Sequence, residues 1–182
     1  AALAKRKMDG TPLRIAFLGD SFIEADIFTL DLRKFLQSRY GGGGAGWMPF
    51  SSEVSGYRQG ITHSFSGWKD HFIIRQSKEL YPLTGHYYTC EGAATLQYKV
   101  AKGYTPWDCA TIFYTSNKEV QVTMSSADTT QRYSLPPSAE MNAYAIKGQG
   151  GEMKLSFSGA EGAKFYGVAL DNTKQSGGVI LD

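Results

Sequence analysis

The chain has 182 residues, of which 42% are hydrophobic and 20% charged, and its formal net charge is +2 at pH 7. This composition is typical of a folded globular protein and excludes a largely disordered chain. The small net charge gives no support to nucleic-acid binding, and no apolar run approaches the roughly 18 residues of a membrane span. Glycine, tyrosine and phenylalanine are abundant, which favours β-structure with many turns.

The first strand leads directly into a candidate nucleophile. Residues 13–18 form a short, continuous apolar run, which predicts a buried strand. It is followed by Gly19-Asp20-Ser21, so Ser21 is expected at the carboxyl end of a strand, where open α/β sheets place their ligands. Asp-Ser is also an ordinary turn and helix-cap pair. The strand before it and the helical pattern after it favour an exposed serine nucleophile.

A helix is predicted next. Within residues 26–40, the side chains of Phe28, Leu32 and Phe35 recur at helical spacing, and Asp26 can cap the helix. The glycine run 41–46 ends it. Because this run follows a helix and lacks a Lys-Ser/Thr ending, we interpret it as a flexible linker rather than a phosphate-binding loop.

Beyond residue 46 the pattern becomes that of short strands. Segments rich in β-branched and aromatic residues recur between Gly, Pro, Asn and Ser, and no convincing helix separates them. The expected strands are 61–65, 72–75, 86–90, 94–100, 109–115, 119–124, 141–146, 152–157 and 164–170. They predict a mainly β fold, a jelly-roll-like antiparallel β-sandwich preceded by one β-α unit. Segments 110–114 and 120–124 are expected to form a hairpin.

The last residues resemble the first strand in character. Residues 177–182 begin an apolar strand, and this strand is expected to pair either with residues 13–18 or with a second molecule. We therefore divide the chain into a first β-α unit (1–45), a sandwich (46–172) and a returning strand (173–182). A sheet with an unfinished edge also invites self-association.

A serine nucleophile needs a base, and the sequence offers no obvious one. His63, His71 and His86 all lie in the β-rich region, and none follows an aspartate by three positions. We expect each to be a surface or strand histidine. No Cys-x-x-Cys pair or His/Cys cluster is present, so neither a metal nor a cofactor is predicted.

Cys90 and Cys109 have two interpretations. They are either small buried residues or, in an oxidising compartment, a disulfide between neighbouring strands. Trp47, Trp68 and Trp107 could stack on sugar rings and form a glycan-binding face, although single aromatic residues in strands are more often part of the core.

The start of the chain resembles the SGNH (GDSL-type) hydrolase superfamily, whose first sequence block carries the nucleophile in Gly-Asp-Ser. It is most similar to bacterial members with an inserted β-sandwich, which act as O-acetyl esterases on peptidoglycan or other polysaccharides. The resemblance covers residues 13–50, including the Gly-Trp-Met-Pro-Phe stretch 46–50, and returns at 166–171 and 177–182. Phe22 stands where these proteins typically have histidine.

The resemblance implies a role for Ser21 as nucleophile, with its own N–H as one oxyanion donor and Asp20 and Gly19 holding the turn. The blocks that supply the remaining oxyanion donors, the base and its carboxylate are expected beyond Asp182. The resemblance also implies a polysaccharide or peptidoglycan substrate and an extracytoplasmic, periplasmic or secreted bacterial protein. A complete signal peptide is absent from residues 1–7, which leaves export open. This fragment alone is expected to be nearly inactive. The alternative is a non-catalytic carbohydrate-binding β-sandwich.

Overall fold

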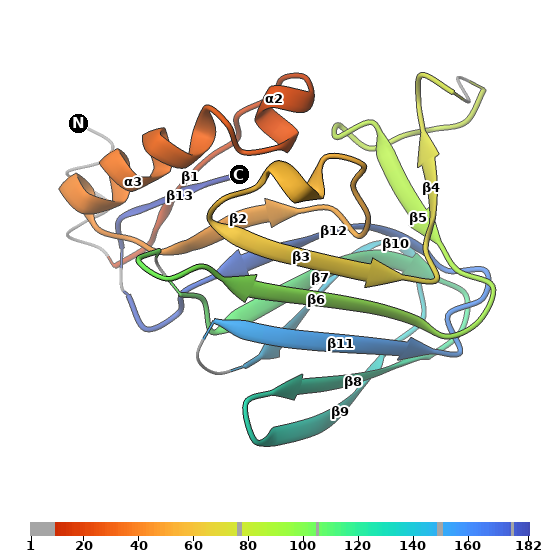
Figure 1. Cartoon of the computed structure of the whole chain (residues 1–182). Coiled ribbons are helices and arrows are strands. Elements are labelled where there is room, and N and C mark those ends of the chain that lie inside the picture. Colours follow the sequence, from red (N-terminus) through yellow and green to blue (C-terminus); the bar gives the residue numbers. More distant parts are fainter. Residues whose placement is uncertain (1–9, 76–77, 105, 149–150, 176) are drawn as a thin grey trace.

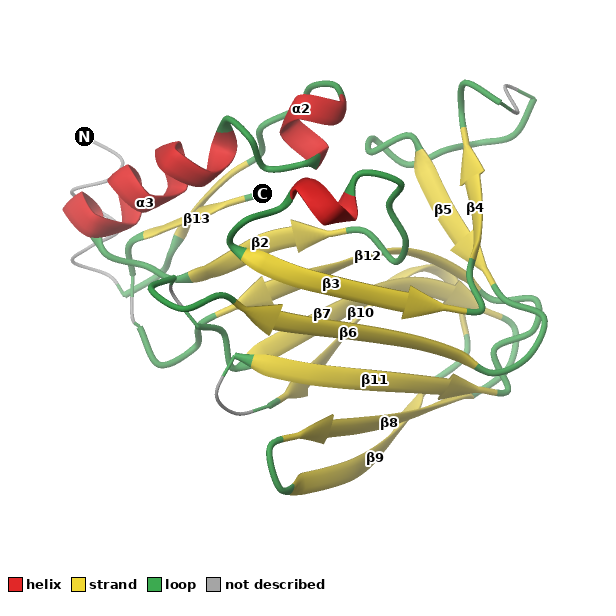
Figure 2. Ribbon diagram, viewed as in Figure 1, coloured by secondary structure: helices red, strands yellow, loops and turns green. Residues whose placement is uncertain are grey.

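The structure of the chain, a computed structural model, describes residues 10–75, 78–104, 106–148, 151–175 and 177–182. Two antiparallel sheets form a sandwich, and a small helical region lies beside it (Figures 1 and 2). The helical elements are α2 (Ser21–Glu24), α3 (Thr29–Tyr40) and the 3-10 turn η1 (Ser55–Tyr57). The predicted mainly β fold with antiparallel sheets is therefore confirmed. Within these residues no helix has the length and hydrophobicity needed to cross a membrane.

The sandwich consists of a six-stranded and a five-stranded sheet. The first has the order β10 (Ser138–Lys147), β7 (Cys109–Ser116), β12 (Lys164–Asp171), β5 (His86–Thr89) and β4 (Lys69–Phe72), with β2 (Gly44–Met48) also paired to β12. The second has the order β3 (Ile61–Ser66), β6 (Ala94–Val100), β11 (Glu152–Ser158), β8 (Val120–Ser126) and β9 (Thr129–Leu135). Consecutive β7 and β8 lie in different sheets, so the hairpin predicted from 110–124 is wrong. Both strands bury alternate residues in one core, and alternation alone does not show which strands pair.

A separate two-stranded parallel sheet lies beneath the helices. It joins β1 (Leu13–Ile15) to β13 (Val179–Leu181), with Leu13 opposite Val179. The predicted pairing of these two segments is confirmed. The predicted extent, residues 13–18, is wrong: the strand stops at Ile15, and Leu18 is 60% exposed. Among the described residues β1 pairs with one strand, β13. The residues that follow Ile15 therefore have little protein packed against them.

The helical region breaks in two at Asp26. This residue has a φ of 61°, and its carboxylate accepts hydrogen bonds from Thr29 Oγ1 at 2.5 Å and Arg33 Nη1 at 2.7 Å. The helix predicted over 26–40 is confirmed from Thr29 to Tyr40. Its predicted start is wrong, because Asp26 has a positive φ that interrupts the helical backbone and turns its buried side chain to α3. Helix α3 begins at Thr29 without a side-chain cap.

The glycine run is not a linker. From Gly44 it forms β2, which pairs with β12 and also passes directly beside β13. A Cβ at Gly46, where φ is 71°, would overlap the backbone oxygen of Leu181, and one at Gly44 would overlap that of Leu170. These glycines allow three backbones to pack closely, a use of glycine that sequence pattern does not distinguish from flexibility.

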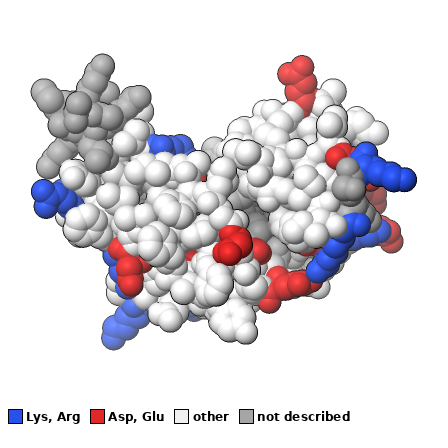
Figure 3. Space-filling model, turned by 90° about the horizontal axis from the view of Figure 1, so that it is seen from above, with Lys and Arg blue, Asp and Glu red and all other residues white. Residues whose placement is uncertain are grey.

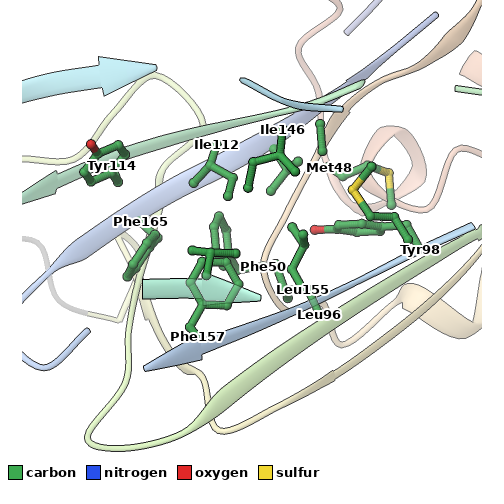
Figure 4. Packing of buried hydrophobic residues seen from close by; sticks show 14 of the residues in the cluster. Met48, Phe50, Leu96, Tyr98, Ile112, Tyr114, Ile146, Leu155, Phe157 and Phe165 are labelled. Carbon is green, nitrogen blue, oxygen red and sulfur yellow. The ribbon is translucent and has the colours of Figure 1, made fainter. Parts of the chain in front are cut away.

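The sandwich core is rich in aromatic rings (Figure 4). Phe50 is fully buried, and its ring centroid lies 4.7 Å from that of Trp68 and 5.1 Å from that of Phe165. The buried hydroxyl of Tyr98 donates to the carbonyl oxygen of Pro49 at 2.8 Å. Because Pro49 and Phe50 directly follow β2, this packing fixes the segment that leads from the parallel sheet into the sandwich.

Candidate functional site

Ser21 is exposed at the beginning of α2, six residues after the end of β1. Asp20 precedes it in extended conformation and caps the helix: its Oδ1 accepts the backbone N–H of Phe22 at 3.0 Å. A Cβ at Gly19 would overlap the side chain of Ile23, so glycine leaves room for the first helical turn. The three residues thus form a tight turn that presents the Ser21 hydroxyl to solvent.

Two side-chain contacts fix the position of this turn. Arg14 of β1 donates to both carboxylate oxygens of Asp182, at 2.9 and 2.6 Å, and to Asp171 at 2.8 Å. Burial by itself lowers the pKa of Arg14, but the hydrogen bonds to the two carboxylates outweigh it and raise that pKa. On the other side, Glu24 of α2 accepts a hydrogen bond of 2.6 Å from Ser52. The strand before the turn is therefore attached to β12 and to the residue after β13, and the helix after the turn is attached to the loop after β2.

The three histidines occupy different environments. His63 is 7% exposed on the core side of β3, and neither ring nitrogen has a hydrogen-bond partner among the residues that the structure describes. Burial first, and the nearby Arg58 charge second, lower the pKa of His63 to about 4. His71 and His86 lie on opposite faces of the β4–β5 hairpin. No hydrogen bond among the described residues joins the Ser21 hydroxyl to a histidine.

The predicted aromatic residues do not form one surface. Trp107 is 2% exposed and lies in the core, so its ring has no face available to a sugar. Trp68 packs against the core with its Nε1 donating to the Thr95 carbonyl. Trp47 differs, because it lies half-buried on the outer face of the six-stranded sheet, against Phe113 and over Gly167.

The cysteines and the acidic residues add no further centre. Cys90 and Cys109 are both buried and unbonded, so the structure favours the first of their two interpretations. In the described part of the chain, no group of three or more His, Cys, Asp or Glu side chains is placed to hold a metal ion.

No known protein family and no curated protein matches the sequence. Among solved structures, a peptidoglycan O-acetylesterase is similar over 100% of this chain and 49% of its own, with a TM-score of 0.68 and 21% identity. This chain thus shares its fold with about half of the length of that protein.

Weaker similarity extends to carbohydrate-binding modules of family 29. One covers 75% of this chain and 90% of its own, with a TM-score of 0.43 and 11% identity. A second, solved with mannohexaose, covers 75% and 94%, with a TM-score of 0.44 and 9% identity.

Proposed function

We propose that this chain is the nucleophile-bearing part of a serine carbohydrate esterase, with Ser21 as the nucleophile. The observation that carries the proposal is the exposed Ser21 at the start of α2, at the end of the loop that follows a strand of a parallel sheet. The likeness of fold to a peptidoglycan O-acetylesterase supports it and suggests O-acetyl groups of peptidoglycan or another polysaccharide as the substrate.

In the proposed reaction, Ser21 Oγ attacks the acetyl carbonyl carbon while a base takes the hydroxyl proton. The bond between the acetyl carbonyl carbon and the sugar oxygen breaks, and the sugar leaves as an alcohol that has taken up that proton. Water then hydrolyses the acetyl-serine to acetate. We propose that the base and its orienting carboxylate come from residues after Asp182, and that residues 46–172 are a sandwich inserted between the catalytic segments. We further propose that the protein works outside the cytoplasm, where such polysaccharides occur.

The test is acetate release from O-acetylated peptidoglycan by the gene product read on past Asp182. Ser21→Ala should lower kcat/KM by about 10⁴-fold or more, because the covalent step is lost. Ser38→Ala, which removes a solvent-exposed hydroxyl from the neighbouring α3, is the matched control and should change it less than about twofold. Equal activity in Ser21→Ala and wild type would disprove the proposal.

A second candidate is a non-catalytic carbohydrate-binding module, and the placement of Trp47 favours it. Its half-exposed ring lies beside Phe113 on the open outer face of the six-stranded sheet. Flat apolar rings on such a face can pack against pyranose rings. Under this alternative Trp47→Ala abolishes polysaccharide binding and Ser21→Ala has no effect on any activity.

A further inference from the structure

The inner face of the β4–β5 hairpin carries a histidine–aspartate pair that the proposed reaction does not use. His86 Nδ1 lies 2.9 Å from Asp70 Oδ1, and the His86 ring stacks on Phe72 with centroids 4.1 Å apart and planes 11° apart. A carboxylate at Nδ1 keeps the proton of the neutral ring on that nitrogen. Nε2 is then the acceptor, and in the described chain it has no hydrogen-bond partner.

The pair is oriented but not enclosed. The side chains of His86 and Asp70 are 20% and 26% exposed. Exposed apolar side chains follow on the same hairpin, since Ile73 is 43% and Leu83 81% exposed. A directed hydrogen-bonding nitrogen beside apolar surface is the combination that a sugar requires, because a pyranose presents hydroxyls at its edge and C–H groups on its faces.

The hairpin and the helix that bears Ser21 border the same loop. Ser52 of this loop donates to Glu24 of α2 at 2.6 Å, and its neighbour Glu53 pairs at 2.8 Å with Arg75, three residues after the end of β4. Seen from above, the surface is hollowed between the N-terminal helices and the hairpin, and acidic side chains lie at the edge of the hollow (Figure 3). Carboxylates at this edge disfavour an anionic ligand and are compatible with an uncharged one that reaches from the hairpin toward α2.

We propose that His86, held by Asp70, binds a hydroxyl of a neutral sugar unit in the same polysaccharide chain whose ester group reacts at Ser21. The inference rests on the proposed function and adds to it a binding contact on the hairpin. His86 acts here as a specificity-determining residue that accepts one hydrogen bond through Nε2. The function of Asp70 is to position His86, and Phe72 supports the ring.

The test measures the affinity of the 182-residue chain for chitopentaose, an uncharged oligosaccharide of N-acetylglucosamine, by calorimetry. His86→Phe keeps a flat ring on Phe72 but removes both nitrogens, and it should weaken binding by about fivefold or more. His71→Phe is the matched control, because His71 lies on the opposite face of the hairpin and stacks on Tyr87. It should change the affinity less than about twofold.

A second measurement does not depend on the folding of a variant. In the wild-type chain, chitopentaose should shift the His86 imidazole resonances in NMR spectra and leave those of His63 unchanged. Wild-type affinity in a folded His86→Phe variant, or an unshifted His86 signal at saturation, would overturn the inference alone. A wild-type chain that binds neither chitopentaose nor O-acetylated peptidoglycan fragments would overturn it together with the carbohydrate part of the proposed function.

Discussion

Arg14 and Asp182 form a two-point ion pair across the parallel sheet: Nε donates to Oδ2 at 2.9 Å and Nη2 to Oδ1 at 2.6 Å. The remaining donor of Arg14 reaches Asp171 at the end of β12. One side chain therefore ties the strand that leads to Ser21 both to its partner strand and to the sandwich.

Arg14→Ala should destabilise the chain by about 1–3 kcal/mol, because it leaves two largely buried carboxylates without their cation. The measurement is the free energy of unfolding in urea. Lys118→Ala breaks the pair between Lys118 and Glu161, in which both side chains are about half exposed, and should cost less than about 1 kcal/mol. Equal losses of unfolding free energy in the two variants would show that the ion pairs of Arg14 stabilise the chain no more than an exposed surface pair does.

The free energy of unfolding should fall as the pH decreases from about 6.5 to about 4. In this range His63 is neutral in the folded chain and protonated in the unfolded chain. Its pKa is about 4 in the folded chain and 6.5 for an unperturbed histidine, so between these values the unfolded chain binds the additional proton. The contribution of neutral His63 to the free energy of unfolding is lost progressively as the pH falls from about 6.5 to about 4, and the total loss is about 3 kcal/mol.

His63→Phe is the variant that isolates this effect, because the ring packs on Tyr98 with centroids 4.8 Å apart and neither nitrogen has a hydrogen-bond partner in the described part of the chain. Urea unfolding of this variant at pH 7 and pH 4.5 should show a smaller difference than in the wild type. An unchanged difference would mean that other groups cause the acid sensitivity.

Gly46→Ala should destabilise the chain by about 3 kcal/mol or more, since a side chain there requires a positive φ and overlaps Leu181. Gly56→Ala, at a position where a Cβ meets no atom within 4 Å, should change stability by less than about 0.5 kcal/mol. Thermal unfolding of the two variants provides the comparison. If the Gly46→Ala variant unfolds at the same temperature as the wild type, β2 and β13 do not pack as closely as described.

Phe50→Ala should cost about 3–5 kcal/mol, because the fully buried ring contacts several other aromatic rings of the core. Phe22→Ala removes a ring that is 60% exposed beside Ser21 and should cost less than about 0.5 kcal/mol. Chemical unfolding distinguishes them, and similar losses for the two would contradict the assigned core.

The sequence pattern predicted the sandwich well where one face of a strand is buried. Strand β6 begins and ends at the residues expected, Ala94 and Val100, because its inner side chains alternate regularly with half-exposed ones. Strand β9 was missed, since it is an edge strand whose side chains are mostly exposed on both faces and therefore show little alternation.

The site was predictable only as far as local sequence determines it. The exposed position of Ser21 follows from a strand, a turn and a helix that are adjacent in the chain. The Asp70–His86 contact joins residues 16 positions apart through the pairing of β4 with β5, and a search for an aspartate three positions before a histidine does not find it. Likewise, Trp47 and Trp107 differ in exposure because of sheet packing, which the residue type does not reveal.

The most direct test of Ser21 as nucleophile is peptide mapping of the protein read past Asp182 after reaction with a fluorophosphonate, which forms a stable adduct with activated serines. We expect one adduct per molecule, on the peptide that contains Ser21, and none in Ser21→Ala. An adduct on a different serine, in a protein that releases acetate from O-acetylated peptidoglycan, would contradict the assignment.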